Sequence, residues 1–96
     1  MIVVWGEKAL SEFVEITEYI AEDNRSASLT MLRKFKEVAK RIGTFPLSGR
    51  LVPEYNNDNV REVIVGNYRL LYIVLMDLEI IHGARMLGPA NDDEDK

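Results

Sequence analysis

Three arginines recur in the most apolar stretch of the chain, and their side chains are the ones best suited to chemistry. Arg61, Arg69 and Arg85 lie among β-branched and aromatic residues, and Glu62 directly follows the first of them. A guanidinium group offers a planar set of N–H donors that matches carboxylates and phosphates. Converging arginines would form a site for an anion or an acidic partner, whereas arginines gathered around Glu62 would form a structural network of ion pairs. Both interpretations are open at this point.

The turn signals within this stretch determine which of these side chains can meet. Residues 66–67 (Gly-Asn) and 76–78 (Met-Asp-Leu) separate three β-rich runs, which predicts a three-stranded antiparallel meander. A three-residue loop at 76–78 places Arg69 opposite Arg85 on one face of the sheet. Like charges are unfavourable there unless solvent, Glu62 or a bound anion compensates them. A two-residue loop would shift the register and separate the pair.

The same pairing predicts the surroundings of two further polar residues. A tight first turn places Glu62 opposite Leu71, on the face that carries Arg69. The three-residue loop places His82 opposite Tyr72. A lone histidine in a strand is typically packed and hydrogen-bonded, although its ordinary pKa also suits proton transfer.

Several classes of chemistry lack the residues that they need. The chain has one histidine and no cysteine, so we expect neither a transition-metal site nor a disulfide framework. It contains no glycine-rich phosphate-binding loop and no G-x-S-x-G motif, so nucleotide hydrolysis and acyl transfer have no support. We expect no cofactor.

The segments before residue 60 supply the elements that must position these side chains. Residues 2–5 form a short β-branched and aromatic run, which is typical of a strand. Apolar residues recur at helical spacing over 7–22 and again over 26–42, and Asn24 or Ser26 can cap the second helix. Residues 44–54 contain two prolines and a glycine, which indicates an irregular connector.

The predicted order of elements is therefore β-α-α-β-β-β. It favours an α+β two-layer sandwich, in which a helical hairpin packs on a mostly antiparallel four-stranded sheet. The first strand needs a partner, and we expect it to join an edge of the meander. The aromatic side chains that we expect in the core are Trp5, Phe13, Phe35 and Phe45.

Charge is segregated along the chain, although the net charge is only −4. Residues 1–24 carry one lysine against six acidic residues, whereas residues 25–50 carry seven lysines or arginines against Glu37 alone. The outer face of the second helix is therefore basic. It could meet nucleic acid, or it could be a solvated face that balances the acidic first helix.

Length and composition are those of one small domain, which we place at residues 1–90. Residues 91–96 are acidic and have no apolar side chain to bury, so we predict a disordered tail. No run reaches the roughly 18–20 apolar residues that cross a bilayer. The apolar start is too short for a signal peptide, and we expect a soluble, cytoplasmic protein.

A set of short motifs follows a recognisable order along residues 3–86. They are Trp5 with Ala9 and Leu10, Tyr19-Ile20-Ala21, Pro46-Leu47-Ser48-Gly49-Arg50-Leu51-Val52-Pro53-Glu54, Arg61-Glu62-Val63, Tyr68-Arg69-Leu70-Leu71-Tyr72 and His82-Gly83-Ala84-Arg85. In this order and at this spacing, they resemble the ParE/RelE superfamily of toxins from type II toxin–antitoxin modules. The last three motifs are the most specific.

The resemblance implies the fold derived above and a cognate antitoxin, ParD-like or RelB-like, whose C-terminal segment wraps the toxin and neutralises it in a hetero-oligomer. It also implies one of two activities. RelE-like members are ribosome-dependent endoribonucleases in which a 2′-hydroxyl attacks its own phosphate. That reaction needs a base, arginines for the developing charge and an acid for the leaving oxygen. The residues that would serve here are Glu54, Arg69, His82 and Arg85.

The chain departs from the nuclease pattern after Arg85. Nuclease members have Tyr or His within the next few residues, whereas residues 86–90 offer nothing that titrates. ParE-like members poison DNA gyrase without a covalent step of their own, so they need no such acid. We therefore predict a ParE-like gyrase inhibitor, with the ribosome-dependent nuclease and a non-toxic antitoxin-binding relative as alternatives. The residues predicted to bind the antitoxin or the target are Arg50, Arg61, Arg69 and Arg85.

Overall fold

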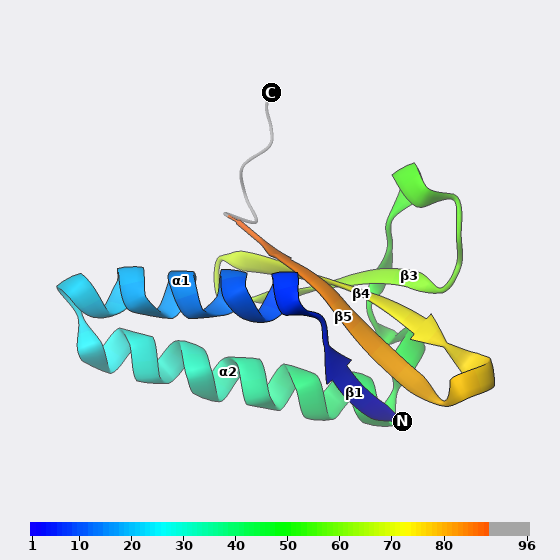
Figure 1. The fold of residues 1–96 in the computed structure, drawn as a ribbon, viewed down its shortest axis with the longest axis horizontal. Coiled ribbons are helices and arrows are strands. Elements are labelled where there is room, and N and C mark those ends of the chain that lie inside the picture. Colours follow the sequence, from blue (N-terminus) through cyan, green and yellow to red (C-terminus); the bar gives the residue numbers. More distant parts are fainter. Residues whose placement is uncertain (89–96) are drawn as a thin grey trace.

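A helical hairpin and a five-stranded sheet form the two layers of the molecule (Figure 1). The computed structural model describes residues 1–88, so the tail predicted at 91–96 lies outside the described residues. The elements are β1 (Ile2–Trp5), α1 (Glu7–Asp23), α2 (Arg25–Thr44), β2 (Arg50–Leu51), β3 (Val60–Val65), β4 (Tyr68–Leu75) and β5 (Ile80–Leu87).

The sheet has the strand order β1-β5-β4-β3-β2. The prediction that the first strand joins an edge of the meander is confirmed, since β1 pairs with β5 in parallel and the helical hairpin makes the crossover. The prediction of four strands was wrong. Arg50 and Leu51 form an additional strand, which pairs with Glu62 and Arg61 of β3. Two residues inside a proline-rich connector are too few to show a strand period in the sequence.

The core lies between the hairpin and one face of the sheet. Helix α2 begins after Asn24, whose side chain accepts a hydrogen bond from the Ala27 amide at 3.0 Å, as predicted for an N-cap. The rings of Phe13 and Phe35 stack with their centroids 4.0 Å apart. The buried residues that the two layers share are Phe13, Met31, Phe35, Val38, Ile42, Val65, Leu70, Tyr72, Val74, Ile81 and Met86.

Phe45 does not belong to this core. Its side chain is 63% exposed, so the prediction for this residue was wrong. Helix α2 continues to Thr44, two residues beyond the predicted end, and Phe45 becomes its C-cap at the surface. Among residues 1–88, neither helix is long and apolar enough to span a membrane.

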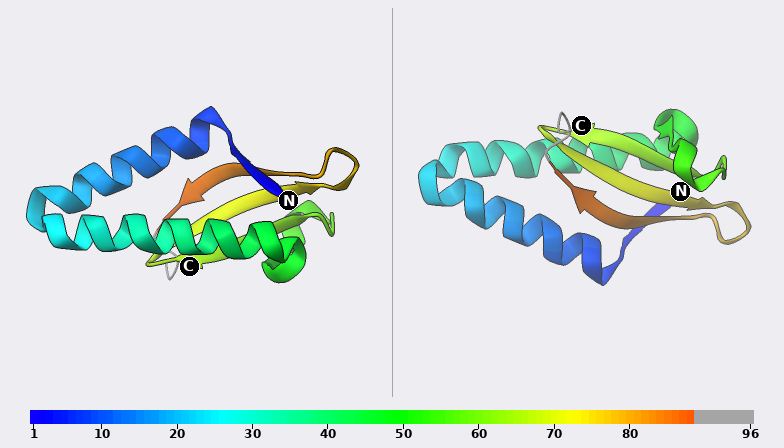
Figure 2. Two further views of the ribbon diagram at one scale, coloured as in Figure 1. Left: turned by 90° about the horizontal axis from the view of Figure 1, so that it is seen from below. Right: turned by 90° about the horizontal axis from the view of Figure 1, so that it is seen from above.

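The helices leave the second face of the sheet uncovered (Figure 2). Successive residues of a strand point to opposite faces. In β4, Leu70, Tyr72 and Val74 therefore point to the hairpin, whereas Arg69 and Leu71 point to the uncovered face. Glu62 of β3 joins them, because it pairs with Leu71. The prediction of Glu62 opposite Leu71 is confirmed. We call this second side of the sheet the open face.

The predicted pairing of Arg69 with Arg85 was wrong. The chain turns over four residues, Met76–Glu79, so that Leu75 pairs with Ile80. A register shift between Leu71 and Tyr72 follows farther along the same ladder. The pairs that result are Arg69 with Leu87, Leu71 with Arg85 and Ile73 with His82.

The longer turn alone separates His82 from Tyr72, which it was predicted to face, because the register shift lies beyond this pair. Tyr72 pairs with Gly83 instead. The extra loop residue is Glu79, which has a left-handed φ of +54°. A residue other than glycine or asparagine is uncommon in that conformation, so the sequence carried no signal for the longer loop.

Candidate functional site

A buried carboxylate lies at the centre of the open face. Glu62 is buried, and it pairs with Arg50 from β2 and with Arg69 from β4. The Arg50 Nε donates to Glu62 Oε2 at 2.7 Å, whereas Arg69 Nη1 lies 3.7 Å from Glu62 Oε1. The ion-pair network predicted as one of two interpretations therefore exists. It satisfies the carboxylate, which would otherwise be costly to bury.

The network leaves donor capacity on both arginines. The side chain of Arg50 is mostly exposed, and that of Arg69 is about one-third exposed. The Nε of Arg69 is buried and has no hydrogen-bond partner within residues 1–88. A carboxylate or phosphate that approached these two guanidinium groups would find N–H donors that Glu62 does not use.

A hollow of about 480 Å³ lies beside this network on the open face. Both charged and apolar side chains line it. The side chains that line it include Arg50, Glu54, Tyr55, Glu62, Arg69, Leu71 and Leu87. A second hollow of about 400 Å³ shares Arg50, Glu62 and Arg69 and is completed by Arg41 from the end of α2. The arginines thus border two adjacent depressions that acidic side chains could enter.

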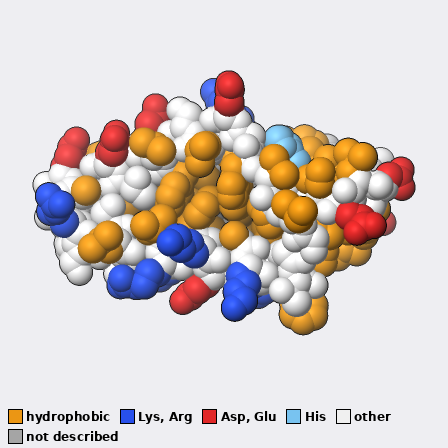
Figure 3. Space-filling view, turned by 60° about the horizontal axis from the view of Figure 1, so that its bottom comes forward, with side chains coloured by type: hydrophobic (Ala, Val, Ile, Leu, Met, Phe, Trp, Pro, Cys, Tyr) orange, Lys and Arg blue, Asp and Glu red, His pale blue; other side chains and the backbone are white. Residues whose placement is uncertain are grey.

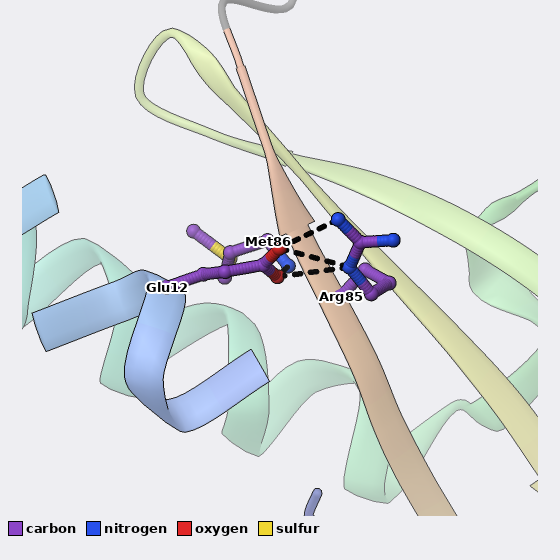
Figure 4. A network of polar contacts seen from close by, with 3 residues as sticks. All are labelled: Glu12, Arg85 and Met86. Atoms are coloured by element: carbon purple, nitrogen blue, oxygen red, sulfur yellow. Dashed lines mark hydrogen bonds and ion pairs between the residues drawn. The ribbon is translucent and has the colours of Figure 1, made fainter. Parts of the chain in front are cut away.

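Arg85 is engaged elsewhere, by Glu12 of α1 (Figure 4). Its Nε and Nη2 donate to Glu12 Oε2 at 2.9 and 2.6 Å, and the Met86 amide donates to Oε1 at 2.8 Å. The hydrogen bond from Arg85 lowers the pKa of the Glu12 carboxyl, against the effect of desolvation. The same contact raises the pKa of Arg85. Arg85 therefore anchors the first helix to the last strand.

Arg61 is on the opposite side of β3 from Glu62. Its Nε donates to the carbonyl oxygen of Asp58 at 2.7 Å, and its Nη1 donates to the carbonyl oxygens of Leu47 and Gly49, each at 3.0 Å. These contacts hold the connector against the sheet. The structure thus brings together two of the four predicted binding arginines, Arg50 and Arg69, and gives Arg61 a local structural contact.

The connector that carries Arg50 is also fixed by Tyr72. The fully buried phenol donates to the Pro46 carbonyl oxygen at 2.7 Å and accepts from the Gly49 amide at 3.0 Å. Desolvation raises the pKa of Tyr72, so the phenol keeps its proton at neutral pH. A side chain at position 49 would collide with this group, because a Cβ would lie 2.6 Å from the Tyr72 oxygen. Glycine is therefore needed beside Arg50.

The four residues of the alternative nuclease site do not converge. Glu54 and Arg69 line the same hollow, but neither His82 nor Arg85 borders it. His82 lies against Gly6, where a Cβ would be 2.8 Å from the imidazole Cε1. No cluster of acidic, histidine or cysteine side chains within residues 1–88 could hold a metal ion. The open face exposes guanidinium donors, but its charged residues are mostly paired with one another.

Glu12 is the residue of this region that sequence reasoning missed. It lies on α1 among other exposed acidic residues, and helical spacing assigns it to the polar side. The only available signal was its position one residue before Phe13, at the border of the buried stripe. Its partner lies 73 residues away, and no local pattern reports such a contact.

Comparison with solved structures identifies the fold. The fold matches a chain from the chromosomal ParDE toxin–antitoxin system of P. aeruginosa with a TM-score of 0.71. The match covers 91% of this chain and 94% of the other at 17% sequence identity. The chain therefore has the fold of a known component of a toxin–antitoxin system.

The family follows from the sequence. Residues 3–87 match the model of the ParE toxin of the type II toxin–antitoxin system, parDE. Because that match spans almost all described residues, the chain belongs to the ParE toxin family. It is a ParE-like type II toxin, as the motifs predicted. A search of curated proteins gave no significant match.

Proposed function

We propose that the chain inhibits DNA gyrase in the cytoplasm and that a cognate antitoxin neutralises it by docking on the open face. The observation that carries this proposal is the separation of the nuclease residues. Arg85 is held by Glu12, and His82 lies outside the hollow that Glu54 and Arg69 share. Cleavage of RNA needs a base, a charge stabiliser and an acid within reach of one phosphate. Gyrase poisoning needs binding alone.

The open face offers what an acidic antitoxin segment would need. Arg50 and Arg69 present unused donors at the border of the hollow, and Leu71 and Leu87 line the same hollow with apolar side chains. Interfaces typically combine a central apolar contact with arginines that pair across them. The remaining donors of Arg69 are then satisfied by carboxylates of the antitoxin.

Parallel assays on one preparation separate the gyrase inhibitor from the nuclease. We expect the purified chain to reduce supercoiling by gyrase and to accumulate cleaved DNA complexes, while mRNA on programmed ribosomes stays intact. Two of the four nuclease residues, Glu54 and Arg69, do share a hollow. The experiment must therefore include the ribosome assay. Codon-linked cuts that disappear in Arg69→Ala would establish the nuclease instead. Unchanged supercoiling at large excess of the chain would refute gyrase inhibition.

The docking site is tested by Arg69→Ala in a titration with the antitoxin. We expect the dissociation constant to rise about tenfold or more, because one partner of a desolvated charge pair is removed. Lys34→Ala is the matched control, since Lys34 is exposed on α2 beside the β3–β4 turn. Equal affinities for both variants would place the antitoxin elsewhere.

A further inference from the structure

The surface of the helical hairpin carries an apolar seam that no other part of residues 1–88 covers. Leu10 and Val14 of α1 are 48% and 45% exposed, and Leu32 of α2 is 37% exposed. Helical spacing places these side chains beside the line along which the two helices touch, where Ser28 Oγ donates to the Thr17 carbonyl oxygen at 2.9 Å. We call this line the hairpin seam.

Opposite charges border the hairpin seam (Figure 3). The figure shows acidic side chains mainly along one rim of the hairpin and basic side chains mainly along the other, with hydrophobic side chains between them. The exposed acidic residues of α1 are Glu7, Glu15, Glu18, Glu22 and Asp23, and the exposed basic residues of the outer side of α2 are Arg25, Arg33, Lys36 and Lys40.

These rim charges form no ion pair within residues 1–88, although Arg33 donates a hydrogen bond to the Thr30 hydroxyl at 3.2 Å. Within residues 1–88, the ion pairs join Arg50 and Arg69 to Glu62, and Arg85 to Glu12. No ion pair links α1 to α2, so the basic helix does not balance the acidic one through direct contacts. Each rim therefore presents mainly one sign of charge to an approaching surface, with Lys8 on α1 and Glu37 on α2 as exceptions.

An apolar line with an acidic rim on one side and a basic rim on the other is complementary to itself. A two-fold axis along the hairpin seam would place α1 of one copy on α2 of the other, and it would place the two seams together. Because the helices are antiparallel and Ser28 lies beside Thr17, Glu7 then faces the region of Lys36 and Lys40. The alternative axis, across the hairpin, would bring like charges together.

We propose that two copies of this chain associate through the hairpin seam into a two-fold symmetric dimer. The interface has an apolar centre and charged rims that repeat across the axis, as two-fold interfaces require. Helices of 17 and 20 residues span about 25 and 30 Å. Side by side, they offer a face of the size from which interfaces of about 800 Å² per partner are built.

The dimer leaves the open face of each sheet available. The hairpin lies on one side of the sheet and Arg50 and Arg69 lie on the other (Figure 2). The two open faces then point away from each other. The dimer is thus compatible with antitoxin docking on the open face, and its existence does not depend on that docking.

Sedimentation of the chain of residues 1–96 over a range of concentrations tests the proposal. We expect a monomer–dimer equilibrium whose dissociation constant rises at least tenfold in K36E/K40E, because the acidic rim of one copy then meets an acidic α2. E7K/E15K should weaken the dimer similarly, through two basic rims. Glutamate and lysine have similar helix propensities, so the helices are preserved.

A mixture of the two variants distinguishes a broken interface from a damaged fold. In the heterodimer, the acidic α1 of K36E/K40E faces the basic α2 of E7K/E15K. The α2 of K36E/K40E, now acidic, faces the α1 of E7K/E15K, now basic. We expect affinity near that of the original dimer. K34E is the control, because Lys34 borders the depression at the β3–β4 turn instead of the seam. A monomer at all concentrations, or a mixture no tighter than the separate variants, would overturn the proposal.

Discussion

At the residue scale, Glu12 connects elements that lie far apart in the chain. Its carboxylate accepts hydrogen bonds from the Arg85 guanidinium and the Met86 amide. The Arg85 contact is the main reason that the pKa of Glu12 lies below its ordinary value, although desolvation opposes the shift. The ionised carboxylate therefore stabilises the fold. It also occupies an arginine that the family motif would otherwise suggest for phosphate binding.

Glu12→Gln should lower the free energy of unfolding at pH 7 by about 1–2 kcal/mol, because the amide loses the charge-assisted hydrogen bonds from Arg85. A lowered pKa in the folded state stabilises above the ordinary pKa of 4.5 and is lost as pH falls through the folded value. Urea unfolding at several pH values should therefore show a difference from the original chain that shrinks below pH 4.5. Glu37→Gln, at an exposed position of α2, is the control and should show no such convergence.

Tyr72→Phe should lower the free energy of unfolding by about 1–3 kcal/mol. The Pro46 carbonyl oxygen and the Gly49 amide both lose their partner in a buried position. Chemical denaturation measures the loss. Tyr55→Phe is a suitable control, because Tyr55 is exposed. If Tyr72→Phe is as stable as the original chain, a water molecule has replaced the phenol oxygen as the hydrogen-bond partner.

At the element scale, the loop between β4 and β5 decides which residues of the open face meet. Sequence reasoning correctly located the loop but made it one residue too short. Met76–Leu78 forms a turn of 3₁₀ helix, and Glu79 adopts the left-handed conformation before β5 begins. One residue of difference, followed by the register shift at Leu71, moved Arg85 away from Arg69.

Glu79→Gly should raise the stability by up to about 1 kcal/mol, because glycine adopts a left-handed φ without the steric cost of a Cβ. Thermal unfolding followed by circular dichroism would detect the change. Asp77→Gly in the same loop is the contrasting variant. Position 77 has no positive φ, so glycine there only adds conformational freedom to the unfolded chain and should destabilise. A loss of stability in both variants would contradict the argument.

At the scale of the whole molecule, the two layers separate two surfaces with different chemistry. The hairpin exposes segregated acidic and basic rims, and the open face exposes an arginine–glutamate network beside a hollow. If both proposals hold, one dimer binds two antitoxin chains, one on each of its two outward-pointing open faces. Native mass spectrometry with saturating antitoxin should then show two of each chain, and Lys36→Glu with Lys40→Glu should reduce the assembly to one of each. Two of each chain in that variant would mean that the antitoxin, not the hairpin, joins the copies.

The sequence by itself determined the order of elements, the buried stripe of each helix and the pairing of Glu62 with Leu71, because hydrophobic period and turn residues are local properties. The tertiary structure alone decided the fifth strand, the surface position of Phe45 and the partners of the arginines. Arg85 meets Glu12 only because α1 packs beside β5, and Arg50 reaches Glu62 only because the connector adds a strand. Such contacts depend on loop lengths and bulges summed over the whole chain, and one residue of difference is enough to change every partner.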